Sequence, residues 1–138
     1  MAVVLIAEDD EDIALILTRL LKRAGNTVLR APDGLAALEL ATKHQPDLLL
    51  TDLGMPRMDG LELTRAIRSD PGLADTPIVM LSGHLHPGDT TPTEAGVCAV
   101  LLKPCPNDKL RAVVQELADR GRHDHSGAAC PSNRPVRA

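Results

Sequence analysis

Five short runs of mostly apolar or β-branched residues recur along the chain, and polar or turn-forming residues bound each of them. Short unbroken apolar runs are typical of strands that are buried on both faces of a parallel sheet. The pattern therefore predicts five strands, at Ala2–Ala7, Asn26–Ala31, Leu48–Thr51, Ile78–Leu81 and Cys98–Leu102.

Between these runs, apolar residues recur at the spacing of one helical face. We expect helices around residues 13–21, 35–41, 63–67 and 110–117. Glycine or proline ends the first three of these stretches, at Gly25, Pro46 and Asp70-Pro71-Gly72. The segment 83–95 contains two glycines and two prolines, which makes it poor helix-forming material.

Regular alternation of strands and helices predicts one α/β domain over residues 1–120. We expect a doubly wound, five-stranded parallel sheet with helices on both faces. From residue 121 onward the composition shifts to Gly, Ser, Pro, His and Arg, which predicts a disordered C-terminal tail over residues 121–138.

Composition excludes several classes of function. The net charge of −4 argues against direct binding to nucleic acid. No apolar run approaches membrane-spanning length, and the start MAVVLIAEDD lacks the basic region of a signal peptide, so a cytoplasmic protein is expected. The spacing of Cys98, Cys105 and Cys130 matches no zinc pattern, which favours reduced thiols. The chain contains no Phe, Tyr or Trp, so its core must be aliphatic.

Candidate chemistry gathers at the carboxyl ends of the predicted strands. Glu8 and Asp9 follow the first strand, Asp52 the third, Ser82 the fourth and Lys103 the fifth. Open α/β sheets place their ligand sites at this edge, so these side chains are expected to converge there. Three carboxylates held together repel one another unless a cation lies among them, and oxygen ligands of this kind suit Mg²⁺.

A carboxylate beside Mg²⁺ can act as a nucleophile towards a phosphoryl group and form an acyl phosphate. A lysine opposite the cation would stabilise the charge on the transferred group, and a serine hydroxyl could donate to one of its oxygens. The residues therefore indicate an aspartate that accepts a phosphoryl group, with Asp52 as the acceptor.

Four segments together resemble the response-regulator receiver domains of two-component signalling. They are Glu8-Asp9-Asp10, the stretch TDLGMPRMDG around Asp52, IVMLS ending in Ser82, and Lys103-Pro104. The resemblance covers the chain to about residue 120. It implies a flavodoxin-like fold with strand order 2-1-3-4-5 and a cis peptide bond between Lys103 and Pro104.

The same resemblance implies roles for individual residues. Asp52 would be the phosphoacceptor. Asp9 would bind Mg²⁺ directly, Glu8 through water and Gly54 through its backbone carbonyl, with Mn²⁺ as an alternative ion. Lys103 would pair with Asp52 and then with the phosphoryl oxygens, and Ser82 would move towards the phosphoryl group. Asp10, Glu11 and Asp12 are interpreted as the solvated start of a helix.

The resemblance also implies partners. The phosphoryl donor would be a histidine kinase or a histidine phosphotransfer protein, and the signal would pass to an unknown downstream protein. The molecule would be a monomer or a weak dimer. The tail is too short for an output module, so the chain could bind a partner protein, relay phosphate, or be a fragment of a larger regulator.

One departure from the family concerns how a signal would be transmitted. Many relatives carry an aromatic residue near the start of the fifth strand, where Val100 stands here, and often another after the Lys-Pro pair, where this chain has Cys105. Coupling therefore cannot use an aromatic rotamer. We hypothesise that phosphorylation instead orders the segment 83–95.

Two functions of other classes stay open. A haloacid-dehalogenase-type phosphohydrolase would need a second Asp two residues after the nucleophile, and Gly54 holds that place. A degenerate, phosphorylation-independent interaction domain would explain the missing aromatic residue but not the full set of acids, Ser82 and Lys103. We expect no enzymatic activity beyond the chain's own phosphorylation and dephosphorylation.

Overall fold

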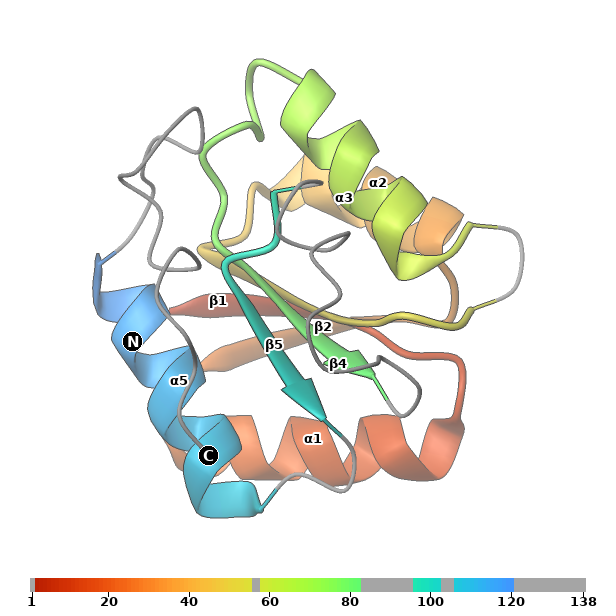
Figure 1. Ribbon diagram of the computed structural model, residues 1–138. Coiled ribbons are helices and arrows are strands. Elements are labelled where there is room, and N and C mark those ends of the chain that lie inside the picture. The colour runs from red at the N-terminus through yellow and green to blue at the C-terminus, as the bar shows by residue number, and fades with distance from the viewer. Residues whose placement is uncertain (1, 56–57, 83–95, 103–105, 121–138) are drawn as a thin grey trace.

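The computed structural model describes residues 2–55, 58–82, 96–102 and 106–120, and in it a helix follows the first, second, third and fifth strands (Figure 1). The strands are β1 (Val3–Ala7), β2 (Thr27–Ala31), β3 (Leu48–Asp52), β4 (Ile78–Ser82) and β5 (Ala99–Leu102). The helices among the described residues are α1 (Glu11–Arg23), α2 (Gly34–His44), α3 (Gly60–Ser69) and α5 (Asn107–Arg120). None of these helices combines the length and the apolar character needed to cross a bilayer.

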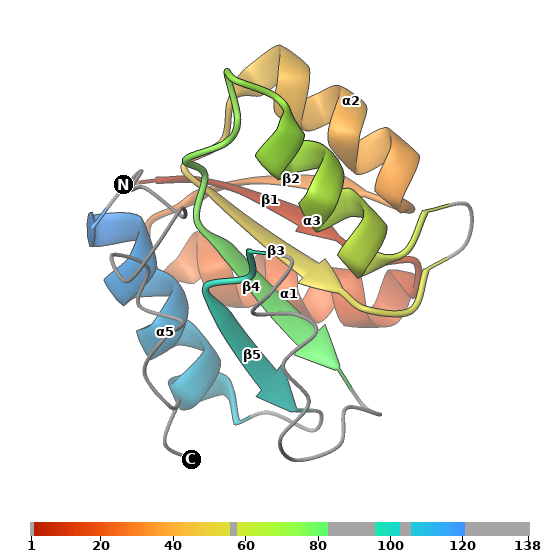
Figure 2. The same ribbon diagram turned by 45° about the horizontal axis from the view of Figure 1, so that its top comes forward.

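The five strands form one parallel sheet in the order β2-β1-β3-β4-β5, which confirms the predicted architecture and strand order. Helices α1 and α5 cover one face of the sheet, and α2 and α3 cover the other (Figure 1 and Figure 2). Because every strand points the same way, all carboxyl ends meet at one edge of the sheet. We call this edge the carboxyl rim and the opposite edge the amino rim.

Alternate residues of each central strand face opposite layers, which explains why the apolar runs are unbroken. In β1, Val4 and Ile6 pack with α1 and α5, whereas Leu5 packs with α2 and α3. The same alternation holds for the leucines of β3, and all of these side chains are fully buried. The core is aliphatic throughout, with Met80 filling space beneath α3.

Aspartates begin three of the helices. The carboxylate of Asp10 accepts hydrogen bonds from the amides of Asp12 and Ile13, and Asp33 accepts one from the amide of Ala36. Asp59 and Glu62 form a reciprocal capping box at the start of α3. Such caps satisfy amides that have no partner within the helix. They confirm that Asp10 to Asp12 form a helix start.

The predicted boundaries were shifted by one to a few residues. β1, β2 and β5 each begin one residue later than expected, and β3 and β4 each extend by one residue to include Asp52 and Ser82. The helices begin earlier and end later than their apolar stripes. The stop at Gly25 is confirmed, since its φ of 94° is a conformation that glycine adopts without strain.

Several predictions fall outside the described residues. These are the role of Lys103, the cis bond to Pro104, the ordering of the segment 83–95 and the disorder of the tail at 121–138. Val100 is described and lies half-buried in β5, packed against the layer of α2 and α3. Cys98 is buried in the core.

Candidate functional site

Three carboxylates meet at the carboxyl rim. Glu8 and Asp9 directly follow β1, and Asp52 is the last residue of β3. Since β1 and β3 are neighbours with Ala7 opposite Thr51, the two chain segments leave the sheet side by side. One oxygen from each carboxylate lies within 4.8 Å of the others. The predicted cluster of acids is therefore present.

The cluster changes from buried to exposed across its width. Glu8 is 2% exposed, Asp52 is half-buried and Asp9 is exposed. Charges of one sign at this spacing repel one another, and a divalent cation would relieve that repulsion. Mg²⁺ prefers carboxylate oxygens and keeps several waters, which the open side at Asp9 could accommodate. The residues therefore fit a hard divalent cation.

Backbone hydrogen bonds fix the position of Glu8. Its amide donates to the carbonyl of Ala31 in β2 at 3.0 Å. Its Oε1 accepts a long hydrogen bond of 3.4 Å from the amide of Asp10. The carboxylate of Asp10 itself turns away to cap α1, so this acid belongs to the helix and Glu8 and Asp9 belong to the cluster.

The turn after β3 holds Asp52. Its Oδ1 accepts a hydrogen bond of 3.0 Å from the amide of Leu53, and the hydroxyl of Thr51 donates to its carbonyl oxygen at 2.9 Å. The amide of Gly60 donates to the carbonyl of Leu53 at 2.8 Å, which brings the start of α3 against this turn. Any side chain at Gly60 would collide with the carbonyl oxygen of Asp52.

The remaining predicted site residues stand as follows. Ser82 ends β4, the neighbour of β3, and is 1% exposed. Gly54 is exposed, two residues beyond Asp52, and a Cβ there would meet no atom within 4 Å. Ser82 and Asp52 thus end adjacent strands. Lys103 follows β5 and lies outside the described residues, so its place at the site stays a prediction.

One residue of the site was missed in the sequence. Arg30, near the end of β2, donates hydrogen bonds to the backbone carbonyls of Glu8 and Asp9. The only signal was a single charged residue inside a mostly apolar run. Its contact with a segment 22 positions earlier depends on β2 lying beside β1.

Comparison with known proteins adds three findings. The family model for the response regulator receiver domain matches residues 4–115. The polar-differentiation response regulator DivK of Brucella anthropi is 34% identical over 102 residues, which cover 73% of this chain and 83% of DivK. The structure of the chemotaxis response regulator CheY4 of Vibrio cholerae has a TM-score of 0.80 and 32% identity, over 85% of this chain and 98% of that one.

A second similar structure bears on the cation. The receiver domain of the sensor histidine kinase PA1611 of Pseudomonas aeruginosa has a TM-score of 0.79 and 27% identity, over 86% of this chain and 98% of that one. It contains a magnesium ion coordinated in its active-site cleft.

Proposed function

The chain belongs to the response regulator receiver family, and on this premise we propose that Asp52 accepts a phosphoryl group from a histidine kinase or a histidine phosphotransfer protein. The observation that carries the proposal is the meeting of Glu8, Asp9 and Asp52, whose carboxylate oxygens lie within 4.8 Å of one another. Receiver domains are signalling modules, and the output here would be a conformational change read by a downstream protein.

The acids would hold Mg²⁺, or Mn²⁺ in its place. Asp9 and Asp52 would bind the ion directly, Glu8 through water and Gly54 through its backbone carbonyl. The magnesium ion in the receiver of PA1611 supports this assignment. When bound, the ion would neutralise the negative charge that the carboxylates and the phosphoryl oxygens bring together.

Transfer would begin with attack by a carboxylate oxygen of Asp52 on phosphorus. A new O–P bond forms while the P–N bond of the donor phosphohistidine breaks, and the electron pair returns to the histidine nitrogen. The hydrogen bond from the amide of Leu53 orients the Asp52 carboxylate for this attack. Lys103 would stabilise the charge on the phosphoryl oxygens, and the hydroxyl of Ser82 would donate to one of them.

The test is a measurement of intact mass after incubation with Mg²⁺ and a small phosphodonor such as acetyl phosphate. We expect one added phosphoryl group in the wild-type chain and none in Asp52→Asn. The matched control is Asp10→Asn, because asparagine caps a helix as well as aspartate does and Asp10 faces α1. This variant should be labelled like the wild type.

Three results would contradict the proposal. A wild-type chain that stays unmodified with every donor would favour an interaction domain that works without phosphorylation. Labelling of Asp52→Asn would place the acceptor elsewhere. Sustained hydrolysis of a phosphate ester such as p-nitrophenyl phosphate would indicate a phosphohydrolase instead.

A further inference from the structure

Arg30 joins the strand at the edge of the sheet to the segment that carries two of the acids. Its Nε and Nη2 donate to the carbonyl oxygen of Glu8 at 3.2 and 2.9 Å. Its Nη2 also lies 3.5 Å from the carbonyl oxygen of Asp9, at the long limit for a hydrogen bond. The guanidinium group therefore contacts the main chain of both residues through a forked set of donors.

The main chain of Glu8 is thus held from β2 at both of its polar groups. Its amide donates to the carbonyl of Ala31, and its carbonyl accepts from the side chain of Arg30. On the other side, Asp10 is committed to the start of α1. The segment from Glu8 to Asp10 therefore spans two fixed anchors, and its carboxylates have little freedom to separate.

We propose that Arg30 is a positioning residue that sets the affinity of the cation site, by holding the main chain from which Glu8 and Asp9 project. This inference rests on the proposed function, since it assumes that these acids bind Mg²⁺ together with Asp52. Three like charges would otherwise move apart in the absence of the ion. By holding them together beforehand, the protein lowers the ordering cost that binding would carry.

The positive charge of Arg30 would act in the opposite direction. A guanidinium group near the acids repels a divalent cation, so its removal would strengthen binding if charge dominated. Arg30 is half-buried and aims its donors at carbonyl oxygens, and Asp9 beside it is open to water, where charges are screened. Positioning should therefore outweigh repulsion, and the sign of the change in affinity decides between the two.

The experiment measures Mg²⁺ binding by isothermal titration calorimetry, since a chain without aromatic residues offers no intrinsic fluorescence. Arg30→Met removes both the forked guanidinium donors and the positive charge, and keeps an apolar side chain of similar reach. Substitution of residues that orient metal ligands typically lowers metal affinity about 10- to 100-fold. For Arg30→Met we therefore expect a dissociation constant for Mg²⁺ about tenfold higher than that of the wild type. Arg30→Lys keeps the charge without the fork and should lie between Arg30→Met and the wild type.

The matched control is Arg68→Met. Arg68 also donates to backbone carbonyls, but at the amino rim. This variant should lose stability and keep the wild-type affinity for Mg²⁺, which separates positioning from general destabilisation. Affinity that is unchanged or tighter in Arg30→Met would overturn the inference, as would an equal loss in Arg68→Met.

A second measurement needs no metal. Amide hydrogen exchange at residues 9–12 should be faster in Arg30→Met than in the wild type and unchanged in Arg68→Met.

A third measurement uses the phosphorylation rate. At saturating Mg²⁺ the rate of phosphorylation in Arg30→Met should return close to the wild-type rate. Unchanged exchange, or a rate that Mg²⁺ does not restore, would count against a positioning role.

The two proposals fail in different ways. If the wild-type chain binds Mg²⁺ and is phosphorylated while Arg30→Met behaves identically, only the role of Arg30 is wrong. If the wild-type chain binds no Mg²⁺, the proposed cation site is wrong and the role of Arg30 fails with it. Arg30→Lys provides the same comparison should Arg30→Met fail to fold.

Discussion

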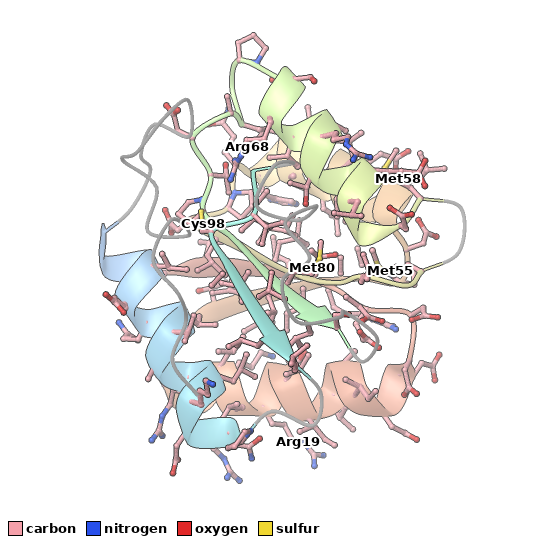
Figure 3. All side chains as sticks on the ribbon, in the orientation of Figure 1. Arg19, Met55, Met58, Arg68, Met80 and Cys98 are labelled. Carbon is pink, nitrogen blue, oxygen red and sulfur yellow. The ribbon has the colours of Figure 1, made fainter. Side chains whose placement is uncertain are left out.

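At each rim of the sheet, an arginine side chain donates hydrogen bonds to backbone carbonyls, but the groups around the two arginines differ. At the carboxyl rim, Arg30 donates to the carbonyls of Glu8 and Asp9, next to a cluster of like charges. At the amino rim, Arg68 of α3 donates to main-chain carbonyls of two loops and lies beside the sulfur of Cys98 (Figure 3).

Arg68 joins the loops that precede β4 and β5 at the amino rim. Its Nη1 donates to the carbonyls of Ala74 and Thr76, which precede β4, at 3.0 and 2.7 Å. Its Nε and Nη2 donate to the carbonyl of Gly96, which precedes β5, at 3.1 and 2.8 Å. The chain passes so close that a Cβ at Gly96 would lie 2.8 Å from Nε of Arg68, and Gly96 also has a φ of 105°.

The comparison shows where the molecule is arranged for stability and where for binding. At the amino rim, the positively charged side chain of Arg68 donates to several backbone carbonyls, an arrangement that lowers the energy of the folded state. The carboxyl rim holds three acids together, which raises that energy until a cation is bound. Removing one of the acids should therefore stabilise the metal-free protein, whereas removing Arg68 should destabilise it.

The largest expected effect comes from Gly60→Ala, beneath the carboxyl rim. The new Cβ would collide with the carbonyl oxygen of Asp52 and lie 3.0 Å from Cα of Leu53, which are backbone atoms that cannot rotate away. We expect a loss of about 3 kcal/mol in the free energy of unfolding, together with weaker Mg²⁺ binding. Urea unfolding followed by circular dichroism measures the free energy of unfolding.

Gly54→Ala is the matched control for this substitution. Its Cβ would meet nothing within 4 Å, and the proposed ligand is the backbone carbonyl, so stability and Mg²⁺ affinity should both be kept. A large loss in Gly54→Ala, or none in Gly60→Ala, would show that the turn after β3 is not packed as described.

Mg²⁺ itself should stabilise the fold. A ligand that binds only the folded state, at 100 times its dissociation constant, adds about 2.7 kcal/mol to the free energy of unfolding. Thermal unfolding with and without Mg²⁺ should show this gain in the wild type and in Asp10→Asn, and not in Asp9→Asn. Equal stabilisation of all three would mean that the ion binds elsewhere.

Arg68→Met should destabilise the protein by about 2 kcal/mol, because hydrogen bonds from a charged donor to buried and half-buried backbone carbonyls are lost. Since the change lies at the amino rim, Mg²⁺ should stabilise the variant as much as it does the wild type. Denaturant unfolding at two Mg²⁺ concentrations measures both quantities. A reduced effect of Mg²⁺ would show that the two rims are coupled.

The smallest effect has the opposite sign. Asp9→Asn removes one of the three like charges, so the metal-free protein should gain about 1 kcal/mol or less, the scale of a charge pair near 4 Å in water. The gain should shrink as salt is added, since Asp9 is exposed. Loss of stability in the metal-free variant would mean that the acids are not under repulsive strain.

Much of the fold could be predicted because the signals are local. Each acid lies next to an apolar run in the sequence, Glu8 and Asp9 directly after β1 and Asp52 as the last residue of β3. A parallel sheet brings the carboxyl ends of its strands to the same rim. The place of Glu8, Asp9 and Asp52 followed from this. Element ends were less well predicted because caps such as Asp33 and Asp59 lie outside the apolar periodicity.

The sequence by itself determined which residues form the layers and which acids lie at the carboxyl rim, because side-chain period and strand direction are properties of each segment alone. Only the tertiary structure decided what holds those acids. The contact of Arg30 with Glu8 requires β2 to lie beside β1 with Arg30 opposite Ile6. The need for glycine at positions 60 and 96 likewise arises from backbone and side chains brought close by packing, and no local pattern records those distances.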